Sequence, residues 1–181
     1  LLDVVQASIE RLPFEPESFD YVYCLGVLQH TPDVEKAFKT LSAYLRVGGK
    51  LAVDFYPKRW QNLLWPKYWL RPLTKRMRPQ VLYHLIAYLT PALLFCSRRI
   101  GCVPRIGRSL RHLVPIADYE GVYPLTESQL REWAILDTLD MLAPAYDSPQ
   151  SSEIVKEWVR DTCLRDYEVF RSGLLICRGS R

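Results

Sequence analysis

One stretch near the beginning of the chain constrains its fold more than any other, the segment from Ser18 to Asp33, which reads SFDYVYCLGVLQHTPD. Its first half, Phe19 to Leu25, has the aromatic and β-branched composition of a strand. The Thr31-Pro32-Asp33 sequence is typical of a helix start, because a hydroxyl can cap free N–H groups, proline suits the first turn, and a carboxylate favours the positive end of the helix dipole. A strand, a turn and a helix in immediate succession predict an α/β arrangement.

The flanking segments extend this pattern. Leu1 to Ala7 has the Val and Leu content of a buried strand, and Leu51 to Tyr56 (LAVDFY) predicts another. Between Val34 and Leu45 apolar residues recur at helical spacing, and Gly48-Gly49 is expected to end that helix. The last two strands are then joined by one helix, which predicts a right-handed parallel crossover.

Charge divides the chain into three parts. The net charge is +4, yet no Asp or Glu occurs between Phe55 and Ala117, where twelve Lys and Arg lie, and the rest of the chain holds twelve basic and twenty acidic residues. We therefore expect a basic, aromatic helical insertion over residues 57–117, between an α/β segment 1–56 and a remainder 118–181. Within the insertion, Val81 to Leu89 and Ala92 to Ile100 predict two short apolar helices separated by Pro91.

The C-terminal third returns to regular patterns. Thr126 to Ile135 predicts a capped helix, and Ser151 to Leu164 predicts a second one with an apolar stripe. Tyr167 to Phe170 and Leu174 to Cys177 predict two strands, which Gly173 separates closely enough for antiparallel pairing.

The residues from Val4 to Tyr56 resemble, in order, the C-terminal two-thirds of a class I S-adenosylmethionine-dependent methyltransferase. The matching pieces are a strand leading into Ala7-Ser8-Ile9, an LPF…SFD connection, a V-L-x-H turn at Val27 to His30, and a helix closed by a glycine pair. A later segment, DTLDMLAPAYDSPQSSEIVKEWV, is similar to one branch of these enzymes. The resemblance implies an α/β fold: an incomplete Rossmann-like methyltransferase sheet with a helical insertion after the third strand present.

The same resemblance implies S-adenosylmethionine as cofactor and methyl transfer to a small-molecule or lipid-like acceptor. The glycine-rich loop of the family, and the acidic residue that binds the ribose, have no counterpart in the 181 residues. We therefore expect the chain to be a fragment. The alternative is a non-catalytic remnant of a methyltransferase that serves as a membrane-surface or partner-binding module.

Site residues follow from the resemblance and from the rule that ligands of open α/β sheets bind at the carboxyl ends of the strands. Gln29 and His30 are weak catalytic candidates, since a histidine there more often caps or packs a helix start. The residues expected to contact the cofactor are Ala7, Ser8, Ile9, Leu25, Gly26, Val27 and His30. Those expected to line the acceptor site are Tyr56, Trp60, Tyr146 and Asp147.

The basic segment is open to several interpretations: a cover over the acceptor site, a peripheral contact with an anionic membrane, a nucleic-acid surface, or a merely solvated face. Its high Leu, Ile and Trp content disfavours nucleic acid and favours an apolar or lipid-like acceptor. The five cysteines are odd in number and form no CxxC pair, so we expect reduced thiols and no metal site. Reduced thiols are typical of a cytoplasmic protein, which we therefore expect here. Under the membrane interpretation, the protein would be peripheral at the membrane. We expect neither a signal peptide nor a transmembrane span.

Overall fold

The computed structural model describes residues 3–59 and 64–181, and it divides into two compact units. The α/β unit comprises Leu1–Lys58 and Tyr146–Arg181, and the helical unit comprises Arg59–Ala145. The helical unit thus extends past residue 117, where we had placed the end of the insertion, because the next helix packs within it. At the base of the insertion the Gln150 N–H donates to the Tyr56 carbonyl at 2.8 Å, and the Lys58 N–H donates to the Gln150 carbonyl at 2.8 Å.

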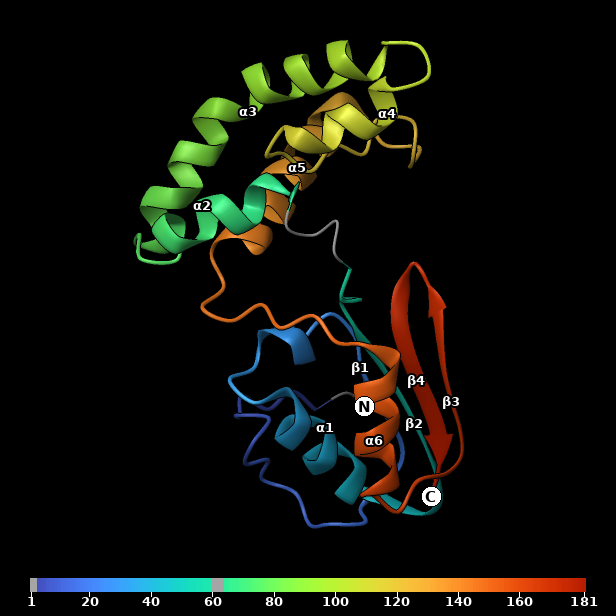
Figure 1. Cartoon of the computed structure of the whole chain (residues 1–181). Helices are drawn as coiled ribbons and strands as arrows, with labels where there is room; N and C mark the ends of the chain where they lie inside the picture. Colours follow the sequence, from blue (N-terminus) through green and yellow to red (C-terminus); the bar gives the residue numbers. More distant parts are fainter. Residues whose placement is uncertain (1–2, 60–63) are drawn as a thin grey trace. The chain divides into compact units, whose positions relative to one another are not determined.

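The α/β unit is built on a four-stranded sheet with the strands in the order β1-β2-β4-β3 (Figure 1). The strands are β1 (Phe19–Cys24), β2 (Leu45–Phe55), β3 (Arg165–Ser172) and β4 (Leu174–Ser180). β1 pairs with β2 in parallel, and β4 is antiparallel to both of its neighbours. This arrangement confirms the predicted α/β class, the parallel pair joined through a helix, and the antiparallel pair at the end of the chain.

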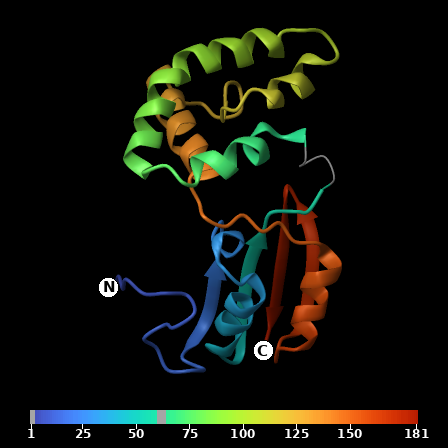
Figure 2. The same cartoon turned by 60° about the vertical axis from the view of Figure 1, so that its left-hand side comes forward.

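Two helices, α1 (Val34–Ala43) and α6 (Ser152–Arg160), cover one face of this sheet (Figures 1 and 2). The Asp33 carboxylate, rather than the Thr31 hydroxyl, caps α1 by accepting the Lys36 N–H at 2.9 Å. Phe38, Phe55 and Trp158 pack together with ring centroids 6.1 to 6.4 Å apart. Because side chains alternate along a strand, Leu51, Val53 and Phe55 of β2 all point into this core.

The opposite face of the sheet is largely exposed. Tyr21 and Tyr23 of β1 are 71% and 78% exposed, and a hollow of about 530 Å³ lies over them. Parallel sheets of the doubly wound kind carry helices on both faces. In this sheet the described helices lie on one face only, and that the sheet is an incomplete Rossmann-like one stays a prediction.

Two sequence predictions for this unit are wrong. The described part of the first predicted strand, residues 3–7, is exposed and forms no strand, because no neighbouring strand in the described chain offers it a hydrogen-bonding partner. The first helix ends at Ala43 and not at Gly48, because Leu45 already pairs with Phe19 across the sheet. Gly48, with φ +82°, and Gly49, packed against the Asp20 carbonyl, instead let the start of β2 bulge.

The helical unit contains α2 (Pro66–Thr74), α3 (Pro79–Gly101), α4 (Gly107–Leu110), the short 3₁₀ helix η3 (Arg111–Leu113) and α5 (Glu127–Leu142). α3 packs along α5, and their shared core includes Leu82, Ile86, Ile135 and Leu142. The predicted cap at the start of α5 is confirmed, and the structure shows it to be a complete capping box of Thr126 and Gln129. The helix continues beyond Ile135 because Leu142 is buried against α3.

α3 is one continuous helix, and the prediction of two helices divided by Pro91 is therefore wrong. A proline removes one N–H donor but leaves the packing on either side intact, and Thr90, which is fully buried, donates its hydroxyl to the Ile86 carbonyl at 2.7 Å. The helix curves visibly along its length in Figure 1, as helices with an internal proline do. By length and composition alone α3 could also cross a membrane, although a core helix passes the same test.

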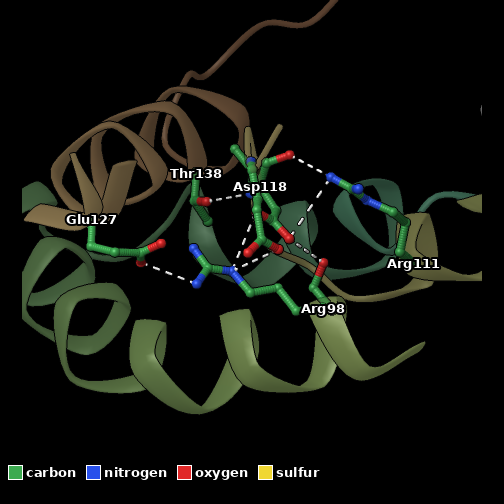
Figure 3. Close-up of polar contacts among 8 residues, drawn as sticks. Arg98, Arg111, Asp118, Glu127 and Thr138 are labelled. Atoms are coloured by element: carbon green, nitrogen blue, oxygen red, sulfur yellow. Dashed lines mark hydrogen bonds and ion pairs between the residues drawn. The ribbon is translucent and has the colours of Figure 1, made fainter. Parts of the chain in front are cut away.

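Asp118 joins the parts of the helical unit through a group of polar contacts (Figure 3). Its carboxylate, 3% exposed, accepts the Ser97 hydroxyl of α3 at 2.8 Å and lies 3.8 Å from the Arg111 guanidinium and 4.0 Å from that of Arg98. Arg98 also pairs with Glu120 at 3.2 Å and with Glu127, the first residue of α5, at 3.0 Å. These contacts hold one face of α3 against the unit.

Candidate functional site

The candidate site is the elbow between β1 and α1, at the carboxyl end of the parallel strand pair. β1 ends at Cys24, and Leu28–His30 form the short 3₁₀ helix η1 before α1 begins. Leu25 and Val27 are 59% and 46% exposed, while Leu28 beneath them is fully buried in the core. The elbow is thus anchored through Leu28 and presents the backbone of residues 25–27 to the outside.

Gly26 sets the shape of the elbow. Its φ of +72° lies in the left-handed region, where residues with a side chain are strained. A Cβ built at this position meets no atom within 4 Å. Glycine is therefore required by the backbone conformation, and the space in front of it is open.

Asp54 of β2 holds this glycine in place. Its Oδ1 accepts the Gly26 N–H at 2.7 Å, and the residue is only 7% exposed. Burial, and secondarily the nearby Asp54 carboxylate, raises the pKa of the Cys24 thiol to about 11, so Cys24 is protonated and unreactive at neutral pH. We did not single out Asp54 from the sequence; the available signal was an acid inside the otherwise apolar strand LAVDFY.

Gln29 and His30 lie together on the inner side of the elbow. The Gln29 carbonyl accepts the Ser148 N–H at 2.9 Å, which ties the elbow to the segment before α6. The Gln29 side chain is fully buried, and neither atom of its amide has a hydrogen-bond partner in the described part of the chain. A buried amide of this kind is costly unless a ligand, a water or a further segment meets it.

His30 contacts two of the residues that we expected to line the acceptor site. Its Nδ1 lies 3.1 Å from the Tyr146 carbonyl, and its ring meets the Tyr56 ring edge-to-face at 5.6 Å. Because a carbonyl can only accept, Nδ1 is the protonated nitrogen, and Nε2 of the neutral ring remains as an acceptor. Nε2 is buried and has no partner among the described residues.

The other expected site residues are distributed as follows. The oxygens of the Asp147 carboxylate are buried beside Tyr146 in the chain, and the Tyr146 side chain is 46% exposed. Trp60 lies outside the described residues. Ala7 and Ser8 are exposed in a local turn, closed by the Arg11 N–H on the Ser8 carbonyl at 3.0 Å, and Ile9 packs against the core. The structure thus brings Gly26, Gln29 and His30 together with Tyr56 and Tyr146, while residues 7–9 form a separate turn.

The first 53 residues match the family model described as "Methyltransferase domain". This match covers both the LPF connection and the elbow, and it confirms the resemblance to class I S-adenosylmethionine-dependent methyltransferases over that part of the chain. The remaining residues lie outside the match.

Curated relatives align over the same part of the chain. The tRNA U34 carboxymethyltransferase of Nautilia profundicola is 44% identical over 47 residues, which are 26% of this chain and 16% of that protein. Phosphoethanolamine N-methyltransferase 2 of Caenorhabditis elegans is 44% identical over 45 residues, 25% of this chain and 10% of that protein. A sterol 4-C-methyltransferase of the same organism is 34% identical over 50 residues, 28% of this chain and 15% of that protein. The matched segment therefore spans at most about a sixth of each of these relatives.

Among solved structures, an S-adenosylmethionine-dependent methyltransferase of Thermotoga maritima, described as a possible histamine N-methyltransferase, aligns with 99% of this chain and 64% of its own. The sequence identity is 14% and the TM-score is 0.46.

Proposed function

We propose that the chain forms part of an S-adenosylmethionine-dependent methyltransferase that acts on a small-molecule or lipid-like acceptor. The observation that carries this proposal is a coincidence of position. The methyltransferase-domain match over residues 1–53 includes the elbow, where an open left-handed glycine lies near the Gln29 amide and His30 Nε2, two buried polar groups without a partner among the described residues.

The elbow has the features that a bound S-adenosylmethionine needs. The open space at Gly26 lets a ligand approach the backbone of Leu25 and Val27, and the Asp54 hydrogen bond fixes that backbone in advance. The cofactor, when bound, supplies a methyl group activated by its sulfonium. Because the donor is already activated, the protein's main task is to position the acceptor.

Gln29 and His30 are suited to that task. His30 Nε2 can accept a hydrogen bond from a hydroxyl or amine of the acceptor, and the Tyr146 carbonyl fixes the ring orientation through Nδ1. The buried Gln29 amide can both donate and accept. If the acceptor must lose a proton, His30 is the group within the elbow that can take it.

One feature of the helical unit favours a small acceptor. The helical unit contains a hollow of about 970 Å³ beside α3 and α5, within the usual range of small-molecule sites, and its lining combines apolar residues such as Leu94 and Ile135 with charged ones such as Glu127 and Arg131. Of six curated relatives that match, four are tRNA U34 carboxymethyltransferases, and the other two are named for phosphoethanolamine and sterol acceptors. The proposal follows the phosphoethanolamine and sterol enzymes because of this hollow, and the tRNA acceptor is one arm of the test.

The test is methyl transfer by the native polypeptide that carries this chain, with tritiated S-adenosylmethionine and three acceptor arms: phosphoethanolamine, a membrane lipid extract, and bulk tRNA. We expect label in one of the first two arms. His30→Asn and Gln29→Leu should each lower kcat/KM at least tenfold, because they remove the polar groups at the elbow. Lys36→Gln, an exposed change on α1, serves as the matched control. Label in tRNA alone would contradict the acceptor class, and no label in any arm would contradict methyl transfer.

A further inference from the structure

α3 presents an apolar stripe to the solvent. Its inner face is buried through Leu82, Ile86, Thr90 and Leu94. On its outer face, apolar side chains follow one another at alternating intervals of four and three residues, which places them in one line along the helix. Their exposed fractions are 53% for Val81, 43% for Leu85, 82% for Tyr88 and 60% for Phe95, with the exposed Ala92 in the same line.

Cations lie at both ends of this stripe and not within it. Between Pro79 and Ser97 the helix carries no Lys, Arg, Asp or Glu. The cations that flank the stripe are all exposed: Lys75, Arg76 and Arg78 before it, and Arg99, Arg105 and Arg108 after it. The Arg99 guanidinium lies over the Phe95 ring, 5.1 Å from its centroid, so the last aromatic side chain of the stripe contacts the first of the cations that follow it.

The acidic residues of the helical unit come from a different part of the sequence. None lies between residues 59 and 117, and all six occur at positions 118–140, in the connection to α5 and in α5 itself. Asp118, Glu120 and Glu127 are engaged by Arg98. The outer face of α3 is therefore apolar along its middle and flanked by cations at both ends, while Glu120, Glu127 and Glu132 lie to one side, in the hollow that Phe95 and Arg99 also line.

We propose that this outer face of α3 is a docking surface for an anionic lipid bilayer, with the helix lying in the membrane plane. An interfacial helix inserts an apolar face among the acyl chains while flanking cations bind anionic headgroups. A second copy of the chain would bring like charges together at both ends of the stripe, so the charge pattern favours a negatively charged partner. The curvature of α3 and its buried inner face favour lying on the membrane over crossing it.

Flotation of the 181-residue chain with lipid vesicles tests the proposal directly. We expect binding to vesicles with about 30% phosphatidylglycerol, little binding to pure phosphatidylcholine vesicles, and loss of binding as salt rises, because the Debye length falls to about 3 Å at 1 M salt. Bound chain should be released by alkaline carbonate. No binding to anionic vesicles at low salt would overturn the proposal, and so would resistance to carbonate, which would indicate a spanning helix.

Matched variants separate the stripe from general surface hydrophobicity. Leu85→Asp with Tyr88→Asp should reduce the partition coefficient at least tenfold. The control, Val122→Asp with Leu136→Asp, changes two side chains of the same unit that are 59% and 51% exposed but lie outside α3, and it should bind as the wild type does. Equal binding by the stripe variant and the wild type would overturn the proposal. If light scattering shows that the wild type is a dimer and the stripe variant a monomer, a second copy of the chain covers the stripe and the proposal is wrong.

A second pair of variants tests the cations. Replacing Arg76, Arg78, Arg105 and Arg108 with Gln should lower binding to anionic vesicles roughly 100-fold or more, since each cation near such a surface contributes roughly fivefold. The control removes four exposed cations elsewhere: Arg131, Lys156, Arg160 and Arg171. Equal losses in both variants would show that net charge alone, and not this face, governs binding. Neither measurement involves methyl transfer, so a negative result leaves the proposed function untouched.

Discussion

Replacing Asp118 with Ala should destabilise the helical unit by about 3 kcal/mol. The substitution leaves the Ser97 hydroxyl, which is 1% exposed, without its acceptor and removes the carboxylate that faces Arg98 and Arg111. Breaking a fully buried ion pair from one side costs about 3–5 kcal/mol. The lower end of this energy range applies here, because the side chains of Arg98 and Arg111 are about a quarter exposed and Arg98 retains its ion pairs with Glu120 and Glu127.

Two further substitutions divide this effect into its parts. Asp118→Asn keeps an oxygen that can accept the Ser97 hydroxyl and loses only the charge, so we expect about half of the destabilisation. Glu127→Gln removes an ion pair whose carboxylate side chain is 73% exposed, and it should cost less than about 1 kcal/mol. The three variants together distinguish a buried charge contact from a surface one.

Urea denaturation followed by tryptophan fluorescence measures these differences. Four of the five tryptophans belong to residues 59–145, and the fifth, Trp158, packs in the core of the α/β unit. In a Trp158→Phe background the signal therefore reports the helical unit. With a slope of about 1.5 kcal/mol per M, the Asp118→Ala midpoint should fall by about 2 M. A shift below about 0.3 M, or an equal shift for Glu127→Gln, would refute the assignment of Asp118 as the main polar anchor of α3.

Three further predictions concern the α/β unit. Titration calorimetry should show no saturable binding of S-adenosylmethionine to the 181-residue chain below millimolar concentration, because no glycine-rich loop is present; micromolar affinity would mean that the cofactor site lies elsewhere. Gly26→Ala should lower the free energy of unfolding by about 1–2 kcal/mol, because residue 26 has a φ of +72°. Gly26→Leu should in addition weaken cofactor binding by the native enzyme at least tenfold, because its side chain fills the open space at the elbow. Equal cofactor affinities of the two variants would show that the elbow is not part of the cofactor site. Burial raises the pKa of Cys24 to about 11 and that of Cys177 to about 12 from an ordinary 9.0. The stability that comes from keeping these thiols protonated is therefore complete below pH 9 and is lost as the pH rises through 11 and 12. Thermal melts in alkaline buffers should show this loss of stability, and an equal loss in a Cys177→Ala variant would argue against the role of Cys177.

Local signals in the sequence were sufficient to predict an element where contacts between near neighbours in the sequence determine its structure. The β1 strand, the start of α1 and the capping box of α5 follow from residue types within four positions of each other. The final hairpin follows from two short apolar runs on either side of Gly173. Each of these elements is specified by hydrogen bonds or packing between near neighbours.

Predictions failed where packing or strand pairing with a segment far away in the sequence determines the structure. Pro91 divides the sequence pattern of α3 but not the helix, because the burial of Ile86 and Leu94 holds both halves in register. Residues 3–7 have strand composition, but a strand also needs a partner. Leu45 has helical spacing and is nevertheless taken into β2 by pairing with Phe19.

The candidate site was only partly accessible from the sequence. The V-L-x-H turn indicated His30, and the position directly after the strand indicated Gly26; the structure places both residues in one elbow. Asp54 was missed because its role depends on a hydrogen bond across 28 positions, and no local pattern marks it. The full burial of the Gln29 amide was likewise invisible, since it results from the packing of η1 and the segment around Ser148.

The paired backbone hydrogen bonds at Tyr56, Lys58 and Gln150 have a consequence for the order of assembly. β2 is synthesised before β4, and the pairing of these two strands must wait until the whole helical unit and β4 have been made. Closing so long an intervening chain is entropically unfavourable, and a tenfold reduction of its effective length lowers the cost by about 2 kcal/mol. A helical unit that folds first brings its two ends together and provides that reduction. We therefore expect the insertion to act as an internal scaffold that prepares the α/β unit for closure, so that slowing the folding of α3 against α5 also delays the completion of the sheet.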